Sequence, residues 1–145
     1  MKRSRILSVI LVLGLVLTGC STTKAQRVTI ELESNPTTGY EWDEEQKEVS
    51  GEEIFEIEDE MIPSKSDELG APGVQKFVLS PEHAGSTVVD FYYGREWEEN
   101  EYLYAVSYEF EVSEDMQVTF VKKTVTPGTD MDESDMPEFP DPVIE

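Results

Sequence analysis

YLYAVSYEFEV, residues 102–112, is the stretch that decides the fold. Large residues occupy every second position, whereas small or charged residues such as Ala105, Ser107 and Glu109 lie between them. Alternate side chains of a β-strand point to the same face of a sheet, so this period of two is typical of a strand with one buried face. The buried face is predicted to contain Tyr102, Tyr104, Val106, Tyr108, Phe110 and Val112.

Six shorter segments on either side also have the composition of strands. They contain β-branched or aromatic residues and are bounded by turns rich in Gly, Pro, Asn, Asp or Glu. These segments are residues 27–33, 40–42, 54–58, 74–79, 86–93 and 116–125. No segment has the pattern of the crossover helices that parallel strands require. The sequence therefore predicts an all-β protein, an antiparallel β-sandwich of about seven strands.

The composition is strongly acidic. The 145 residues include 32 Asp and Glu against 11 Lys and Arg, which gives a net charge of -21. Because such a surface repels phosphate groups, we expect no nucleic-acid partner and no binding of the folded part to anionic lipids. The length and the 38% hydrophobic content suit one globular domain. The single cysteine, Cys20, excludes an internal disulfide and a zinc site made of several thiolates.

The N-terminal segment has the order of residues expected of an export signal. Lys2, Arg3 and Arg5 precede a predominantly apolar run, residues 6–17, that is too short to span a bilayer. The run ends in Leu17-Thr18-Gly19-Cys20, which resembles the lipobox of bacterial lipoproteins. The alternative is an ordinary secretory signal with an incidental cysteine.

The lipobox implies that residues 1–19 are removed and that the Cys20 thiol carries diacylglycerol. Residues 20–26 would then form the lipidated cysteine and a short polar tether. Acyl chains hold an attached soluble domain at a membrane surface. We therefore expect an extracytoplasmic protein that is lipid-anchored to a bacterial cell membrane.

The C-terminal segment, residues 127–145, contains seven acidic residues, four prolines and no base. Such a composition buries little apolar surface, so we predict a disordered, solvated tail that follows a folded domain of residues 27–126. Asp130, Asp132 and Ser134 have the spacing of a calcium loop. However, Asp135 and Asp141 stand where that loop needs Gly and Glu, which favours the disordered tail.

Motifs that carry catalytic chemistry are absent from the sequence. There is no zinc-peptidase, nucleophile-elbow or phosphate-loop motif, and no cofactor is expected. His83 lies in a predicted turn, where an exposed histidine without a catalytic role is the simpler interpretation. A hydrolase that uses two carboxylates is disfavoured because no spacing singles out a pair among 32. The sequence thus indicates a protein that is not an enzyme.

Three predicted loops have unusual chemistry. The first, which we call the NPTTG loop, consists of Asn35, Pro36, Thr37, Thr38, Gly39 and Tyr40. Pro36 fixes its own φ and Gly39 permits a positive φ, so we expect this loop to be stiff without helix or sheet pairing. A stiff exposed loop loses little entropy when it binds a partner.

The other two loops are short. The glycine loop consists of Gly70, Ala71, Pro72 and Gly73, and the Arg-Trp loop consists of Arg95, Glu96 and Trp97. Small residues permit close approach of a partner backbone, and exposed Arg and Trp are favoured interface anchors. Each loop alone also fits a simpler interpretation: a turn, a glycine hairpin, and a Trp folded back onto the sandwich.

Taken together, the three loops resemble those of the chagasin-like inhibitors of papain-type cysteine peptidases. The resemblance covers roughly Val28 to Val112, and NPTTG followed by an aromatic residue is its most specific part. It implies an immunoglobulin-like sandwich whose three loops form a wedge that enters the peptidase cleft. The NPTTG loop would lie over the catalytic cysteine, with the glycine loop and the Arg-Trp loop on its two flanks.

Two positions depart from the family pattern. Pro72 stands where a Gly is usual and removes a backbone donor, and Glu96 stands where a rigid Pro is usual. We expect Pro72 either to re-aim the glycine loop or to remove a donor from a strand-like contact with the enzyme, and Glu96 either to lower the affinity or to favour a target that is electropositive beside Trp97.

Family members usually have a strand before the one that leads into the NPTTG loop. That strand has no counterpart here, because only residues 21–26 lie between Cys20 and the predicted strand at residues 27–33. An extra strand, residues 116–125, follows the usual end of the domain instead. We hypothesise that it fills the vacant sheet edge, guarded by Lys122 and Lys123. The alternative is that it extends the opposite edge.

The favoured function is therefore a reversible, non-covalent inhibitor of papain-like cysteine peptidases, expected to be a monomer. The runner-up is an envelope binding or adhesion module that uses the same loops for another protein or a glycan.

Overall fold

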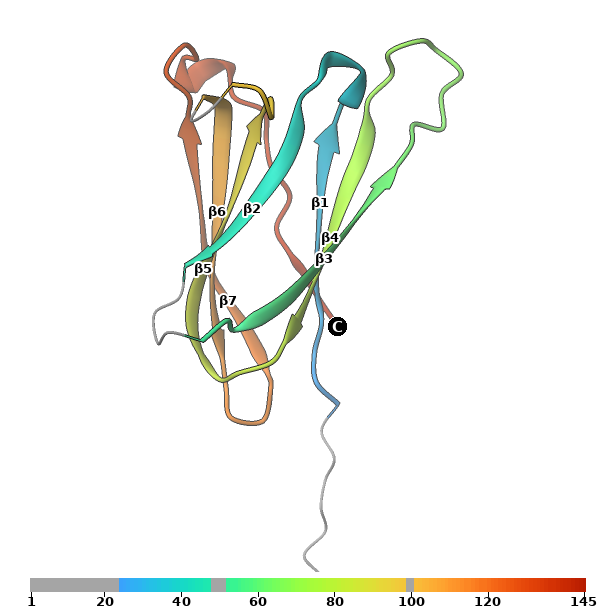
Figure 1. The fold of residues 1–145 in the computed structure, drawn as a ribbon. Coiled ribbons are helices and arrows are strands. Elements are labelled where there is room, and N and C mark those ends of the chain that lie inside the picture. Colours follow the sequence, from blue (N-terminus) through green and yellow to red (C-terminus); the bar gives the residue numbers. More distant parts are fainter. Residues whose placement is uncertain (1–23, 48–51, 99–100) are drawn as a thin grey trace, which may run out of the picture.

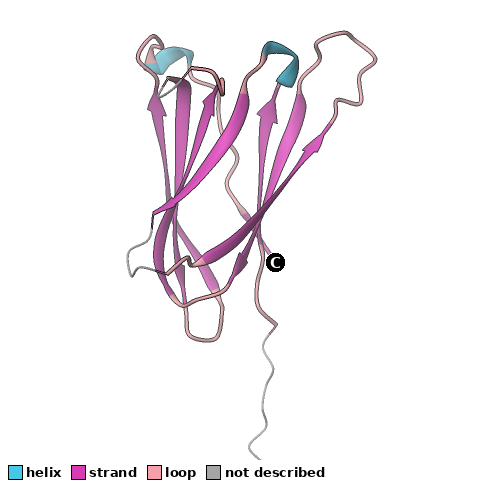
Figure 2. Cartoon of the chain, viewed as in Figure 1, coloured by secondary structure: helices cyan, strands magenta, loops and turns pink. Residues whose placement is uncertain are grey.

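The computed structural model describes residues 24–47, 52–98 and 101–145, and it consists of two antiparallel β-sheets packed face to face (Figures 1 and 2). The predicted all-β sandwich is confirmed. The strands are β1 (Val28–Ser34), β2 (Glu41–Lys47), β3 (Phe55–Ile62), β4 (Gly73–Pro81), β5 (Gly85–Gly94), β6 (Tyr102–Val112), β7 (Val118–Pro127) and β8 (Val143–Ile144). Two 3-10 helices, η1 (Pro36–Thr38) and η2 (Glu133–Asp135), lie between strands.

The first sheet has the strand order β3-β4-β1-β8 and the second has the order β2-β5-β6-β7. All seven predicted strands are present, and β6 covers the predicted residues 102–112. The short predicted strand at 40–42 is longer in the structure, where β2 pairs with β5 from Glu41 to Lys47. β8 is the one strand of the described chain that the sequence did not predict.

The core lies between the two sheets and follows the alternation of the sequence. In β1, Val28, Ile30 and Leu32 are fully buried, whereas Glu31 and Glu33 on the other face are exposed. Aromatic side chains dominate the centre of the core. Phe77 of β4 meets Phe91 of β5 with ring centroids 4.7 Å apart, and Phe55 of β3 meets Phe110 of β6 at 5.5 Å. Burial of these rings supplies much of the stability of the sandwich.

Glutamine side chains join the sheets where the chain crosses between them. Gln75 of β4 accepts a hydrogen bond from the Trp42 backbone N–H and donates one to the Trp42 carbonyl, both at 3.0 Å. The Trp42 indole N–H donates to the Glu33 carbonyl at 2.9 Å. Because Trp42 lies on an edge strand, Gln75 satisfies backbone groups that no neighbouring strand reaches. The start of β2 is thereby fixed to the first sheet.

The prediction of a disordered C-terminal tail is wrong. Val143 and Ile144 pair with β1, and the Arg27 and Glu145 backbones exchange hydrogen bonds of 2.8 and 3.0 Å. Phe139 is half-buried and packs against the core. The segment is ordered because its few apolar residues meet an open side of the sandwich and because β1 offers unpaired backbone groups there. High acidity does not prevent this, since its carboxylates remain exposed.

The strand predicted at residues 116–125 is present as β7, but it does not lie beside β1. It pairs with β6 at the edge of the second sheet, while the free edge of β1 is taken by β8. The two lysines do lie on this edge strand. Lys122 forms an ion pair with Glu109 at 3.2 Å, and Lys123 forms one with Asp141 at 2.7 Å. The hypothesis that residues 116–125 fill the vacant edge is therefore wrong. β7 extends the second sheet, and β8, at the C-terminal end, closes the first sheet.

The predicted signal peptide, residues 1–19, and Cys20 lie outside the described residues. Of the predicted tether, the described part begins at Lys24, and the Gln26 side chain accepts a hydrogen bond from the Val118 N–H at 2.8 Å. In the described part of the chain, no helix is long and apolar enough to cross a membrane.

We predict that a chain ending at Met136 is less stable than the full chain by about 2–4 kcal/mol, because the packing of Phe139 and Ile144 is lost. Urea denaturation followed by circular dichroism measures this difference. Val143→Ala is the matched control, because the Val143 side chain is 56% exposed and its truncation should change little. An unchanged midpoint for the shortened chain would restore the interpretation of a disordered tail.

Candidate functional site

The three loops singled out in the sequence lie at the same end of the sandwich (Figure 1). η1 is at the tip of the connection between β1 and β2, the glycine loop connects β3 to β4, and the Arg-Trp loop follows β5. Direct contacts join them. The Asn35 side-chain N–H donates to the Gly70 carbonyl at 2.9 Å, and the Trp97 ring packs against Gly39. The structure therefore brings the predicted site residues into one surface.

Asn35 organises the NPTTG loop from within. Its carbonyl accepts hydrogen bonds from the Thr38 backbone N–H at 3.0 Å and from the Thr38 hydroxyl at 2.6 Å. Its side-chain oxygen accepts a bond from the Thr37 hydroxyl at 2.6 Å. The expected absence of helical structure is incorrect, because Pro36–Thr38 forms a 3-10 turn that ends at Gly39 with a φ of +79°. The predicted glycine conformation is thus present.

Tyr93 supports this loop from below, a role that the sequence analysis missed. The Tyr93 hydroxyl accepts a hydrogen bond from the Asn35 backbone N–H at 3.0 Å. The Tyr93 ring stacks on Tyr40 with centroids 5.5 Å apart and lies 4.9 Å from the Trp42 ring. Because Tyr93 is buried, with only 7% of its surface exposed, both stems of the loop rest on a fixed ring.

The glycine loop is exposed at two of its four residues. Gly70 is exposed and has a φ of +80°, and Pro72 is also exposed. Gly73 is different, because it is buried as the first residue of β4 and a Cβ there would meet the Ile62 carbonyl. Its role is close packing of backbones. The neighbouring Leu69 is fully exposed beside Gly70, and the sequence analysis did not single it out.

The Arg-Trp loop presents a large exposed ring. Trp97 is 68% exposed, so it is not folded into the core as the simpler interpretation would have it. The Arg95 guanidinium lies 4.2 Å from the centroid of the Tyr40 ring and 5.7 Å from that of Trp97, within the range of cation–π interaction. Its Nη1 also pairs with Glu98 at 3.2 Å, while Glu96 points to solvent. Arg95 therefore joins this loop to the NPTTG loop.

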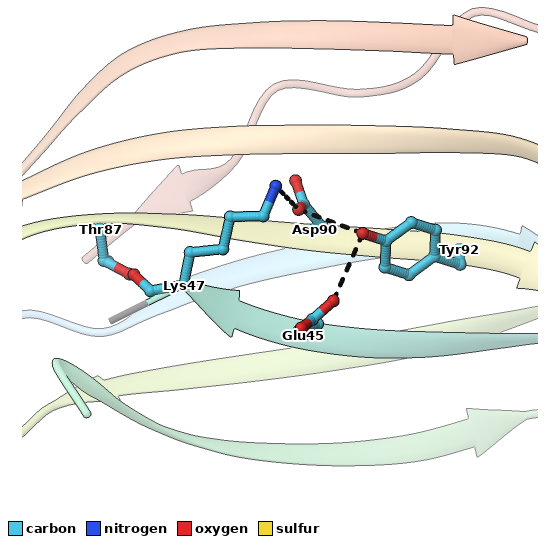
Figure 3. Close-up of polar contacts among 5 residues, drawn as sticks. All are labelled: Glu45, Lys47, Thr87, Asp90 and Tyr92. Carbon is cyan, nitrogen blue, oxygen red and sulfur yellow. Dashed lines mark hydrogen bonds and ion pairs between the residues drawn. The ribbon is translucent and has the colours of Figure 1, made fainter. Parts of the chain in front are cut away.

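The best-connected polar cluster lies elsewhere, on the outer face of the second sheet (Figure 3). Asp90 of β5 is almost fully buried, pairs with Lys47 at 2.5 Å and accepts a hydrogen bond from the Tyr92 hydroxyl at 3.2 Å. Burial by itself raises the pKa of Asp90, but the hydrogen bonds from Lys47, Ser107 and Tyr92 and the charge of Lys47 outweigh it and lower the pKa below its usual value. Burial and then Asp90 raise the pKa of Tyr92 to about 12. The cluster fixes β2 to β5.

His83 is exposed, and its Nδ1 lies 2.8 Å from the Glu53 carbonyl, which agrees with the interpretation that it has a structural place in a turn. Among the described residues, no group of three or more His, Cys, Asp or Glu could hold a metal ion. The exposed groups of the three loops include the threonines of the NPTTG loop, Gly70, Pro72, Glu96 and the Trp97 ring, a mixture that suits contact with another protein.

A rigid sandwich that presents three joined and exposed loops at one end is a loop-based binding protein. This chain belongs to the chagasin family of peptidase inhibitors (I42), whose sequence profile matches residues 21–113. The resemblance inferred from the three loops is therefore confirmed. The family match ends before β7, so β7 and the C-terminal segment lie outside the matched residues.

Individual relatives agree with this membership. The chain is 40% identical to chagasin of Trypanosoma cruzi over 72 residues, which cover 48% of this chain and 66% of chagasin. It is 31% identical to amoebiasin-2 of Entamoeba histolytica over 74 residues, covering 49% of this chain and 57% of amoebiasin-2. The chain therefore spans just under two thirds of the length of chagasin and a smaller part of amoebiasin-2. The crystal structure of the cysteine protease inhibitor EhICP2 from Entamoeba histolytica matches 57% of this chain and 73% of that chain, with 26% identity and a TM-score of 0.46.

We predict that Gly39→Ala destabilises the protein by about 1–2 kcal/mol through its positive φ and also displaces the Trp97 ring, which a Cβ would strike. Gly70→Ala is the matched control, because its φ is also positive but the nearest atom to its Cβ would be the Thr37 hydroxyl oxygen at 4.0 Å, an ordinary contact. Acrylamide quenching of tryptophan fluorescence should therefore change in Gly39→Ala and not in Gly70→Ala. Equal quenching in the two variants would contradict the packing of Trp97 on Gly39.

A second prediction concerns how the stability of the fold depends on pH through Asp90. Because the pKa of Asp90 is lower in the folded state, its ion pair stabilises the fold above the unfolded-state pKa of about 4 and this stabilisation is lost as the pH falls through the folded-state pKa. Asp90→Asn should thus lower the free energy of unfolding by about 1 kcal/mol at pH 7 and by progressively less below pH 4. The loss is modest because the Lys47 side chain is largely exposed and solvent screens its charge.

Melting temperatures at several pH values measure this difference. Asp67→Asn, an exposed change in the connection between β3 and β4, is the control and should show no comparable loss of stability at pH 7. A stability deficit for Asp90→Asn that is the same at pH 3 and pH 7 would rule out the ion pair as its cause.

Proposed function

We propose that this protein is a reversible, non-covalent inhibitor of papain-like cysteine peptidases that occludes the active-site cleft with its three loops. The observation that carries the proposal is the joining of these loops into one exposed surface by the Asn35–Gly70 hydrogen bond and the Trp97–Gly39 contact. Membership in a family of peptidase inhibitors supports it.

In this proposal the NPTTG loop is the central element of the wedge. Pro36, Thr37 and Thr38 are exposed at its tip, and the threonine hydroxyls are already bonded to Asn35. The tip therefore loses little conformational entropy when it enters a cleft. Its backbone is a closed 3-10 turn rather than an extended strand, so no peptide bond is presented as a substrate would present it. The loop blocks the catalytic cysteine without being cleaved.

The two flanking loops would supply affinity on either side. Trp97 offers an exposed aromatic surface of the kind that anchors interfaces, and its contact with Gly39 fixes it beside the tip. The glycine loop offers the fully exposed Leu69 and a backbone with little side-chain bulk at Gly70 and Ala71. Pro72 has no N–H to donate, so contacts of this flank with the enzyme backbone are made by its neighbours.

Inhibition by occlusion needs no nucleophile and no proton transfer, and the relatives of this chain are named as inhibitors. The protein is not an enzyme. We propose that it acts as a monomer with one peptidase molecule, because the loop end forms a single continuous surface.

We also propose that the mature chain begins at a lipidated Cys20 and acts outside the cytoplasm at a bacterial membrane surface. The order of the basic, apolar and small residues before Cys20 supports this. β1 begins at the end of the sandwich opposite the NPTTG loop (Figure 1), so an anchor that precedes β1 would leave the binding loops turned away from the membrane.

The direct test is a titration of papain and related peptidases with the chain from Ser21 to Glu145. The expected result is competitive inhibition that is reversed by dilution. Carboxymethylation of the peptidase's catalytic cysteine with iodoacetate should weaken binding only as far as the added group fills the cleft. The inhibitor should never become covalently attached to the peptidase. A panel of papain-like peptidases that all remain fully active would refute the proposal.

Trp97→Ala should weaken inhibition by about 2 kcal/mol, or roughly thirtyfold in Ki, because a large exposed anchor is removed. The free energy of unfolding should change little, since the ring is mostly exposed. Val121→Ala, another exposed apolar residue on the distant edge strand β7, is the control and should leave Ki unchanged. The opposite pattern, loss of stability with full inhibition per folded molecule, would make Trp97 a structural residue.

A further inference from the structure

The C-terminal segment lies beyond the family-matched residues 21–113, yet it reaches the base of the candidate binding site. Its one aromatic residue, Phe139, packs edge-on against Trp42 with centroids 5.8 Å apart. It also lies 5.5 Å from the ring of Tyr104. In Figure 1 this segment descends from the loop end, on the side where β8 pairs with β1. A segment outside the family-matched residues thus touches the rings that carry the NPTTG loop.

From Phe139 a continuous series of rings leads to the binding loops. Tyr104 stacks on Tyr93 with an angle of 12° and a distance of 5.3 Å, and Tyr93 stacks on Tyr40 at 5.5 Å. Arg95 then lies over Tyr40 at 4.2 Å. We call these four rings, Phe139, Tyr104, Tyr93 and Tyr40, the aromatic column. It begins in the C-terminal segment and ends between the NPTTG loop and the Arg-Trp loop.

The column also has a polar connection to the loop backbone. The Tyr93 hydroxyl accepts the hydrogen bond from the Asn35 N–H, and Asn35 in turn holds the 3-10 turn and the Gly70 carbonyl. A change in the tilt of the Tyr93 ring therefore moves or breaks the bond on which the loop is organised. Close-packed interiors transmit such shifts, because no free volume absorbs them.

Phe139 itself is firmly held. Its carbonyl accepts a hydrogen bond from the Lys123 ammonium at 2.6 Å, and the next carbonyl, that of Pro140, accepts one from the Tyr108 hydroxyl at 2.8 Å. Lys123 also pairs with Asp141. These bonds fix the segment to the second sheet, while β8 fixes it to the first. These bonds to both sheets hold the Phe139 ring in place against Tyr104, the next ring of the column.

We infer that residues 137–145, the last part of the C-terminal segment, brace the peptidase-binding loops, and that Phe139 is a positioning residue for inhibition that acts through Tyr104 and Tyr93. The inference rests on the proposed function, since it concerns the same loops. It assigns a binding role to a segment that lies outside the family domain and that touches no peptidase itself.

The test compares two truncations within the segment. Phe139→Ala removes the base of the column, whereas Ile144→Ala removes a core contact of β8 that is not in the column. Both variants should lower the melting temperature. At a temperature where both are folded, Phe139→Ala should raise Ki about tenfold or more and Ile144→Ala should leave it within about twofold. Phe139→Tyr, which keeps the ring, should restore inhibition.

Hydrogen exchange of the Asn35 amide, followed by NMR in the free protein, tests the bracing without a peptidase. Exchange should be faster in Phe139→Ala and unchanged in Ile144→Ala. In a Tyr93→Phe background, where the acceptor for Asn35 is gone, Phe139→Ala should add little to Ki, because the two changes interrupt one connection.

The outcomes separate this inference from the proposed function. If the wild type inhibits no papain-like peptidase, the proposed function fails, and the Asn35 exchange rates alone decide the bracing. If Phe139→Ala and Ile144→Ala alter Asn35 exchange or Ki to the same degree, or if neither alters them, the bracing is overturned and the segment only contributes to global stability.

Discussion

The structure depends on how the chain passes from one sheet to the other at the NPTTG loop. β1 and β2 belong to different sheets, so β2 begins with an edge that has no strand beside it. Gln75 occupies that edge and bonds both backbone groups of Trp42. A buried backbone group without a partner would cost the full penalty of its lost hydration. The geometry of one glutamine thus decides where β2 starts and how far apart the stems of the loop lie.

The rigidity of the loop surface depends on this passage of the chain from β1 to β2. Once Trp42 is fixed, its ring supports Tyr93, and Tyr93 supports Asn35 and Tyr40. The loops then need only short internal bonds to hold their form, and their exposed atoms remain free for a partner. The lower part of β2 is joined in the same manner, because the Gln46 side chain bonds the backbone of Ile54 and Phe55. Two amide side chains therefore take the place of a strand pairing.

Strong periodicity made most of the fold predictable. The alternation from Tyr102 to Val112 defines β6, and Pro36 and Gly39 indicated a constrained loop that the structure contains. The features that escaped prediction have no period. β8 is only two residues long, and Phe139 is a lone aromatic among acidic residues, so their order arises from surfaces contributed by β1 and β6. Gly73 resembled a loop glycine because sequence does not reveal that the Ile62 carbonyl lies against it.

The placement of β1 has a mechanical consequence. β1 pairs with β4 along its whole length and with β8 at its start, while the NPTTG loop extends from its far end. Tension between the chain that precedes Val28 and a molecule held by the loop would pull β1 along its own axis. Ladder hydrogen bonds lie perpendicular to the strand, so such a load shears many of them together instead of unzipping them in turn. The sandwich thus resists a force applied between the chain before Val28 and the NPTTG loop better than a force that would separate its strands one bond at a time.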